Sequence, residues 1–254
     1  MEAKRVRYEK SPLVEVIFQL RFPTILSINA RQPVEFQELI RKQFPFYEEG
    51  IEQQNEFLIT PAIGQAQVKT SQNKNYSFVS ADNSYKVNLT STFIAVSTLN
   101  YTQWEHFKEK IEYVISIFEK VYEPAFYTRV GLRYIDVIER SSIGLNERKW
   151  TELVQPHVLG IVANHEEGIN SYVSEAEFKD PNDGIGTKTH FEFVHANGNE
   201  ETSLLIDCDY FKNEIVPAGK MIELADSLHT HSSSFLRTAI KDDLHNAMQP
   251  VEIS

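Results

Sequence analysis

The residues best suited to chemistry are histidines and aspartates between positions 226 and 245 of the sequence. Asp226 and His229 are three residues apart, as are Asp242 and His245, and His231 forms an H-x-H with His229. On a helix, a spacing of three places both side chains on one face. If these groups converged, they would form a metal site, and metal-assisted hydrolysis of a phosphoester would be its natural reaction.

A simpler interpretation of the same residues is structural, and we favour it. Nothing in the sequence shows that the five side chains converge, and solvated helix positions or a hydrogen-bonded core histidine account for them equally well. We therefore expect no bound metal and no cofactor. If one histidine supports the fold, His229 is the best choice because it adjoins the apolar Leu224–Leu228 stripe.

Three arginines form the second group of interest. Arg21, Arg129 and Arg133 lie in apolar segments with strand-like alternation, on the side opposite the most apolar residues. Arg129 and Arg133 are four apart, so on a strand they point the same way. Guanidinium groups bind carboxylates and phosphates in a bidentate manner. We predict a ligand-binding surface formed by these arginines and Tyr134, for a small anionic ligand or a partner protein.

The alternative for the arginines is pairing within the chain. The formal net charge is −11, with 36 acidic and 25 basic residues, so acidic partners are abundant. Internal pairing is the more frequent outcome in so acidic a chain. The candidate partners are Glu15, Glu139 and the aspartates of the segment "IDCDYF".

Composition and missing motifs exclude several functions. An acidic chain is disfavoured for general nucleic-acid binding, which depends on contacts to phosphate. The sequence contains no GxxxxGK[ST], GxGxxG, GxSxG or HExxH motif, so common nucleotide-binding, hydrolase and zinc-protease sites are not expected. The single cysteine, Cys208, excludes an internal disulfide and reads as a buried strand residue.

We expect a cytoplasmic protein that does not enter membranes. The N-terminal residues MEAKRVRYEK lack the apolar region of a secretory signal. No apolar run approaches the roughly 20 residues that span a bilayer.

Hydrophobic periodicity predicts the elements that position these residues. Apolar residues alternate with polar ones from Val14 to Phe22, which indicates a half-buried strand. A short helix is expected within residues 33–45, a β meander over 46–100, and a long strand over 126–140. Gly131 inside that strand suggests a bulge or a close approach to the backbone. A further short helix is expected over 146–156, followed by three strands before residue 212.

Two long amphipathic helices are expected. Residues 103–122 carry one broad apolar stripe, and Thr102 with Glu105 reads as a capping box. Residues 219–248 carry another stripe, interrupted by HTHSSS, which predicts a kink or break there.

The order of these elements predicts an α+β fold. Antiparallel β-sheets would each be covered by one long amphipathic helix. Residues 1–140 would form an N-terminal lobe and residues 141–254 a C-terminal lobe packed on it, although the two may count as one domain. In each half of the chain the meander is followed by an amphipathic helix, which is compatible with a divergent internal duplication.

The segments PLVEVIFQLRF and YTRVGLRYID, with the pattern H…F…AI…L near the end, resemble an uncharacterised bacterial family that is sporadically distributed among unrelated bacteria. The resemblance spans nearly the whole chain and implies no assigned activity. Sporadic occurrence implies horizontal transfer, with a mobile-element or phage-defence context.

These observations favour a non-enzymatic binding or accessory protein that uses an arginine- and aromatic-rich sheet face. Aromatic and arginine side chains are common interface anchors, and Tyr76, Tyr85, Tyr127 and Tyr134 are expected to be exposed on strands. A metal-dependent hydrolase is the alternative, and a homodimer is a further alternative for the assembly.

Overall fold

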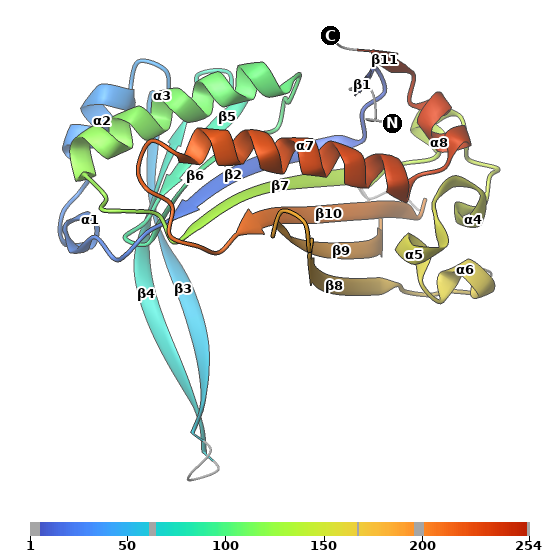
Figure 1. Ribbon diagram of the computed structural model, residues 1–254, viewed down its shortest axis with the longest axis horizontal. Helices are drawn as coiled ribbons and strands as arrows, with labels where there is room; N and C mark the ends of the chain where they lie inside the picture. The colour runs from blue at the N-terminus through green and yellow to red at the C-terminus, as the bar shows by residue number, and fades with distance from the viewer. Residues whose placement is uncertain (1–5, 61–64, 167, 196–200, 253–254) are drawn as a thin grey trace.

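The computed structural model describes residues 6–60, 65–166, 168–195 and 201–252, and for residues 52–60 and 65–72 it describes the backbone alone. Figure 1 shows one large sheet with two long helices lying along the same side of it. All strand pairs are antiparallel, in the order β3-β4-β5-β6-β2-β7-β10-β9-β8. The expected α+β class with antiparallel strands is confirmed. The strands of the two predicted lobes form one continuous sheet, which crosses the predicted boundary at residue 140.

The strands of this sheet follow the predicted segments closely. Their bounds are β2 (Leu13–Arg21), β3 (Phe46–Thr60), β4 (Gln65–Val79), β5 (Tyr85–Leu89), β6 (Phe93–Thr98), β7 (Arg129–Ile138), β8 (Val173–Lys179), β9 (Gly186–Val194) and β10 (Ser203–Lys212). Two further strands, β1 (Val6–Tyr8) and β11 (Pro250–Glu252), pair with each other outside the sheet.

The two halves of the chain repeat one topology. The first half starts with β2, passes through α1 (Leu26–Ala30) and α2 (Val34–Ile40), and returns through a meander whose last strand, β6, pairs with β2. The second half starts with β7, passes through short helices, and returns to place β10 beside β7. Because β2 and β7 pair antiparallel, the halves are related by an approximate twofold arrangement. This topology supports the internal duplication suggested by the sequence.

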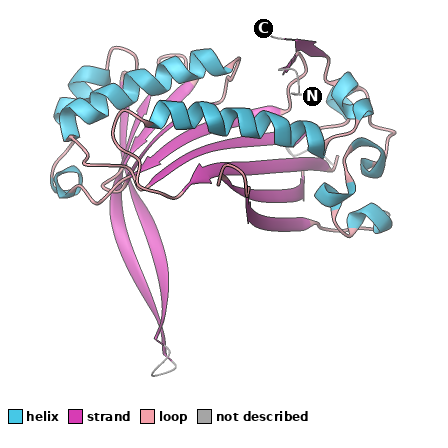
Figure 2. Ribbon diagram, in the orientation of Figure 1, coloured by secondary structure: helices cyan, strands magenta, loops and turns pink. Residues whose placement is uncertain are grey.

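The helices cover one face of the sheet. Each half ends in a long helix, α3 (Trp104–Tyr122) or α7 (Met221–Ala239), and Figure 2 shows both on the same side of the strands. The shorter helices are α4 (Trp150–Leu153), α5 (Pro156–Leu159), α6 (Val162–His165) and α8 (Asp242–Ala247). No described helix is both long and apolar enough to cross a bilayer.

The core lies between this helix layer and alternate residues of the strands. Phe18 of β2 and Leu132 of β7 are directly opposed and fully buried, and both Ile111 and Phe118 of α3 are inaccessible to solvent. Neighbouring residues in a strand point to opposite faces. The intervening residues of β2, β7 and β10 therefore lie on a face that none of the described helices covers, which we call the open face.

The long helix near the end of the chain is continuous where a break was predicted. The HTHSSS segment lies inside α7, and the helix ends at Ala239 before α8 begins. The hydroxyls of Ser232 and Ser233 both donate to the carbonyl of His229, at 2.8 and 3.1 Å. These bonds satisfy the serine side chains inside the helix, so they do not compete with its backbone bonds.

The predicted capping box of α3 is also absent. The N-cap is Gln103, with no side-chain cap bond, and the Thr102 hydroxyl lies 3.1 Å from His106 Nδ1. The helix itself spans the predicted residues because its apolar stripe packs on the sheet, which contributes more than a single cap.

The strands β3 and β4 form a ribbon that extends beyond the sheet. β4 pairs with β5 only from Tyr76 to Val79, whereas its pairing with β3 continues to Thr60 and Gln65. In Figure 1 this ribbon projects away from the helices. The short strands predicted around EFLITPA and AQVKTS are parts of this ribbon, and residues 61–64 lie outside the described residues.

His229 supports the contact between the two long helices, as expected. Its ring stacks on Trp104 of α3, with centroids 4.7 Å apart and an interplanar angle of 10°. Its Nδ1 lies 2.8 Å from the hydroxyl of Tyr134 in β7. His229 therefore joins α3, α7 and the sheet.

We predict that His229→Ala lowers the free energy of unfolding by about 2–3 kcal/mol, because it removes the stacked ring and leaves the Tyr134 hydroxyl without this bond. Urea unfolding followed by circular dichroism measures the change. His106→Ala, on the exposed side of α3, is the control and should change stability by less than about 0.5 kcal/mol. Equal effects of the two substitutions would contradict the proposed role of His229.

Candidate functional site on the open face of the sheet

The three arginines predicted to share a surface do so. Arg21 of β2 is directly opposite Arg129 of β7. Arg133 lies four residues beyond Arg129 on the same face of β7, with Gly131 between them. The register of β10 then places Asp209 opposite Arg133. The open face therefore carries a layer of charged side chains at the centre of the sheet.

Two of these arginines are paired with the aspartates of "IDCDYF". Arg133 binds Asp207 in a bidentate manner, with Nε 2.7 Å from Oδ1 and Nη2 in contact with Oδ2. Arg129 Nη2 donates to Asp209 Oδ2 at 2.6 Å. The charge-assisted bond with Asp207 raises the pKa of Arg133 above its ordinary value. Pairing within the chain, the alternative favoured from the sequence, is what the structure shows for both residues.

Gly131 makes room for Arg129. A Cβ atom at Gly131 would lie 2.2 Å from Nη1 of Arg129, which is too close for two atoms that are not bonded. The guanidinium thus lies over the Gly131 backbone, and its Cζ is 4.8 Å from the ring centroid of Phe211. The close approach predicted at this glycine is confirmed, and the approaching group is a side chain of the same strand.

Arg21 is held differently. Its Nε donates to Gln19 Oε1 at 3.2 Å, and the same oxygen accepts from Arg129 Nη1 at 3.3 Å. Arg21 and Arg133 are both exposed, whereas Arg129 is only partly exposed.

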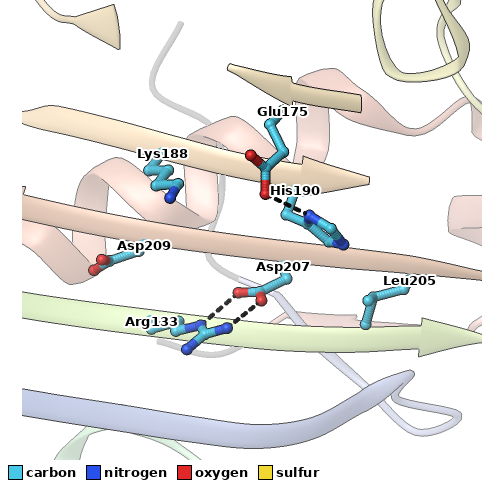
Figure 3. Close-up of a pocket in the computed structure, with 7 residues that line it drawn as sticks. All are labelled: Arg133, Glu175, Lys188, His190, Leu205, Asp207 and Asp209. Carbon is cyan, nitrogen blue, oxygen red and sulfur yellow. Dashed lines mark hydrogen bonds and ion pairs between the residues drawn. The ribbon is translucent and has the colours of Figure 1, made fainter. Parts of the chain in front are cut away.

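A shallow pocket of about 310 Å³ lies beside this charged layer, over β7, β10, β9 and β8 (Figure 3). Its floor contains the Arg133–Asp207 pair. Its rim contains His190, whose Nδ1 and Nε2 lie 2.9 Å from Glu175 and 3.0 Å from Glu192. The hydrogen bond with Glu192 has the largest effect in raising the pKa of His190, and the bond with Glu175 raises it further. The lining residues are Arg133, Glu175, Lys188, His190, Leu205, Asp207 and Asp209.

The charges in this pocket are mixed. Arg133 and Lys188 are opposed by three carboxylates, with His190 adding positive charge when it is protonated. A site for a small anion would need an excess of positive groups. The arrangement instead presents fixed charges of both signs, which suits the side chains of a protein surface better than a single phosphate or carboxylate.

Tyr134, predicted to join the arginines, lies on the opposite face. Its ring packs against the core beneath α7, where the hydroxyl meets His229. Tyr76 and Tyr127 are fully buried as well, so the expectation of exposed strand tyrosines was wrong for these residues. Alternation of side chains along β7 is the reason, since Tyr134 follows Arg133 directly.

The aspartates and histidines near the C-terminal end are not gathered in one place. Asp226 accepts hydrogen bonds from Trp104 Nε1 and Lys108 Nζ, both at 2.7 Å. His245 Nδ1 lies 2.8 Å from the Tyr8 hydroxyl. Asp242 binds Arg237 at 2.5 Å, and His229 contacts Trp104. Of the five residues considered as metal ligands, only His231 belongs to a group of three potential ligands in the described part of the chain, together with Asp180 and Asp183.

Cys208 is buried on the helix-covered face, with 3% of its surface exposed. Burial raises the pKa of its thiol to about 12. A thiolate nucleophile therefore does not form at neutral pH, which agrees with the reading of this residue as a small core side chain.

A buried acid, Asp136 in β7, was missed from the sequence. It lies on the helix-covered face, opposite Ile206, with 5% of its surface exposed. Burial, with a smaller effect of the Asp207 charge, raises its pKa to about 7. The alternation of β7 contained the signal. Asp136 falls on the side of the strand whose preceding residues are Val130, Leu132 and Tyr134.

Asp136 should make stability depend on pH. Because its pKa in the folded protein, about 7, exceeds the ordinary value of 3.8, the fold favours the protonated form. The contribution of Asp136 to the free energy of unfolding is then fully present below pH 3.8, the ordinary pKa, and is lost as the pH rises through 7. We predict that the free energy of unfolding falls by about 2–3 kcal/mol between pH 5 and pH 8.

Asp136→Asn should remove this part of the pH dependence, as measured by urea unfolding at several pH values between 5 and 8. Glu112→Gln, on the exposed side of α3, should keep the wild-type slope. An unchanged slope in Asp136→Asn would show that Asp136 is not the responsible group.

Comparisons with known proteins add no functional information. No protein-family model matches the chain, and no curated protein matches it.

Proposed function

We propose that this protein is a non-enzymatic binding protein that recognises a partner protein through the open face of its sheet. The observation that carries the proposal is the charged layer on that face. Arg129 and Arg133 are held by Asp209 and Asp207 from a neighbouring strand, beside a shallow pocket of about 310 Å³.

The helix layer explains why this face is available. Helices α3 and α7 cover the other side, so the apolar residues of the strands are already buried there. The open face therefore needs no further cover for stability. Its charged side chains are fixed by neighbouring strands, so little conformational entropy remains to be lost when a partner binds.

The mixed charge of the surface supports a protein partner over a small anion. Fixed charges of both signs give selectivity, because a mismatched partner places like charges together. Apolar groups lie among these charges. Phe211 is buried under Arg129, whereas Leu205 is partly exposed and lines the pocket. Leu205 would supply apolar contact area within a polar surface.

A site-specific crosslinking experiment tests the proposal. A photoreactive amino acid at Lys188, which is exposed in the pocket, should give crosslinks to a defined protein in cells that produce this protein. The same group at Glu112, exposed on α3, is the control and should not give that product. Identical products at both positions, or none at Lys188, would contradict the proposal.

Binding of the crosslinked protein should depend on the charged layer. We expect Arg133→Ala to weaken it by at least about tenfold, because Asp207 would be left without its guanidinium in the interface. Arg148→Ala removes an arginine paired with Glu152 and Asp243 outside the open face, and it should have little effect. Purified variants and calorimetry provide the measurement.

Unfolding temperatures measured with inorganic phosphate and with citrate distinguish a protein partner from a small anionic ligand. The proposal expects no stabilisation by either anion. An increase in unfolding temperature that Arg133→Ala abolishes would overturn the protein-partner proposal in favour of a small anionic ligand.

A further inference from the structure

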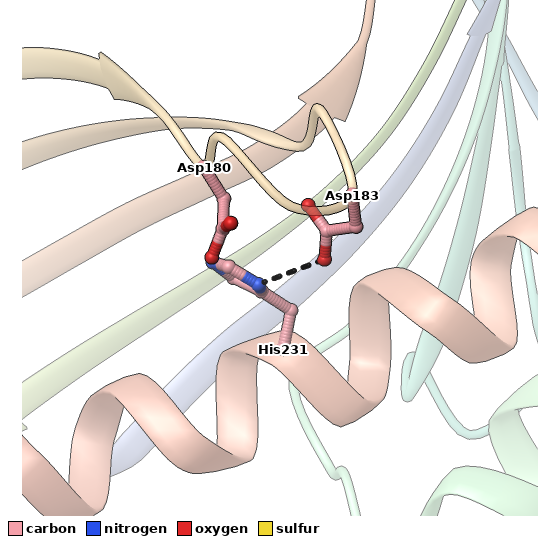
Figure 4. A group of neighbouring side chains, drawn as sticks. All are labelled: Asp180, Asp183 and His231. Atoms are coloured by element: carbon pink, nitrogen blue, oxygen red, sulfur yellow. Dashed lines mark ion pairs between the residues drawn. The ribbon is translucent and has the colours of Figure 1, made fainter.

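The turn between β8 and β9 meets helix α7 at a cluster of three potential metal ligands. Asp180 and Asp183 come from the turn and His231 comes from α7 (Figure 4). One ligand atom from each residue can be chosen so that all three lie within 4.8 Å of one another. This cluster is separate from the charged pocket on the open face and does not depend on the proposed function.

The spacing of these atoms differs from that of a hydrogen-bonded ion pair. His231 Nδ1 lies 3.6 Å from Asp183 Oδ2, which is too long for a hydrogen bond. Two ligands bound tetrahedrally to one zinc ion at about 2.0–2.1 Å lie about 3.4 Å apart. The separation is thus close to what a shared ion requires.

The two carboxylates are also oriented by their own turn. One oxygen of Asp180, Oδ1, accepts from the backbone and side-chain nitrogens of Asn182 at 2.8 and 3.0 Å. In Asp183, Oδ1 accepts from the Ile185 nitrogen at 2.8 Å, which leaves Oδ2 facing His231. Each bond fixes one oxygen of a carboxylate and thereby sets the direction of the other, as second-shell groups do in metal sites.

His231 is positioned from the helix side. Its side chain is 18% exposed, and Nε2 lies 3.4 Å from the hydroxyl of Thr187, a fully buried residue of β9. Such a contact at one ring nitrogen restrains the ring and leaves the other nitrogen available as a ligand.

His190 of β9 shows the contrasting arrangement. His190 also lies between two carboxylates, but both of its nitrogens are at hydrogen-bond distance from them, 2.9 and 3.0 Å. At these distances the imidazole is hydrogen-bonded directly to both carboxylates. The two histidines therefore provide a matched comparison within one protein.

We propose that Asp180, Asp183 and His231 bind a divalent transition-metal ion of the zinc type, with water completing its coordination. One imidazole and two carboxylates form a ligand set that suits Zn²⁺ better than Mg²⁺ or Ca²⁺, which prefer oxygen ligands alone. Three protein ligands leave an open position, as in zinc sites that bind an exchangeable group. The ion would connect the β8–β9 turn to α7.

The test uses the full chain, freed of metal by a chelator and titrated with Zn²⁺ alone at pH 7.5 in a calorimeter. We expect one ion per chain and an increase in unfolding temperature that the chelator reverses. Asp183→Asn and His231→Gln should each weaken binding by at least about tenfold, since each removes one of three ligands. Mg²⁺ should not bind at this site.

His190→Gln is the control and should bind Zn²⁺ as the unaltered protein does. Unfolding temperatures measured without metal separate lost ligands from lost structure, and we expect all variants to remain folded. Failure of the unaltered protein to bind Zn²⁺ would overturn the proposal. So would binding that is equal in all variants, or binding that His190→Gln abolishes.

Discussion

The pairing of β2 with β7 is the constraint on which the rest of the structure depends. These strands belong to different halves of the chain, and their antiparallel register sets Phe18 against Leu132 and Gln19 against Gly131. The first pair is fully buried under the helices, whereas the second lies on the open face. One register therefore fixes both the core and the surface, and a slip of a single residue would exchange them.

The open face follows from the same arrangement. With both long helices on one side, each strand buries alternate residues there and presents the others to solvent. The positions left uncovered in β7 and β10 hold arginines and aspartates that the register brings together. Pairing between neighbouring strands holds these charged groups in defined positions without a second layer of protein over them. This surface is the basis of the proposed binding function.

The buried positions of the same strands show the opposite behaviour. Asp136 occupies one of them, and the loss of hydration raises its pKa to about 7. Cys208 and Tyr210 on β10 lie in the same layer, and burial raises the pKa of both. Whether an ionisable group in this sheet is paired and charged or buried and neutral thus depends on which of two faces it occupies.

The sequence by itself determined the elements and the class of the fold. Periods of two and of about 3.6 are local properties of the chain, and they identified β2, β7 and α3 nearly to their ends. The helix predicted over residues 219–248 is two helices, α7 and α8, which separate after Ala239 and not at HTHSSS. The tertiary structure decided which residues meet. Arg133 and Asp207 are separated by 74 positions, and His231 lies 48 positions beyond Asp183. A local sequence pattern does not specify contacts between residues so far apart in the chain, because these contacts depend on strand order and on how α7 packs across the sheet. For the same reason, the metal cluster considered as an alternative from the sequence lay within one predicted helical segment, whereas the packing places His231 in a group with Asp180 and Asp183 of a turn.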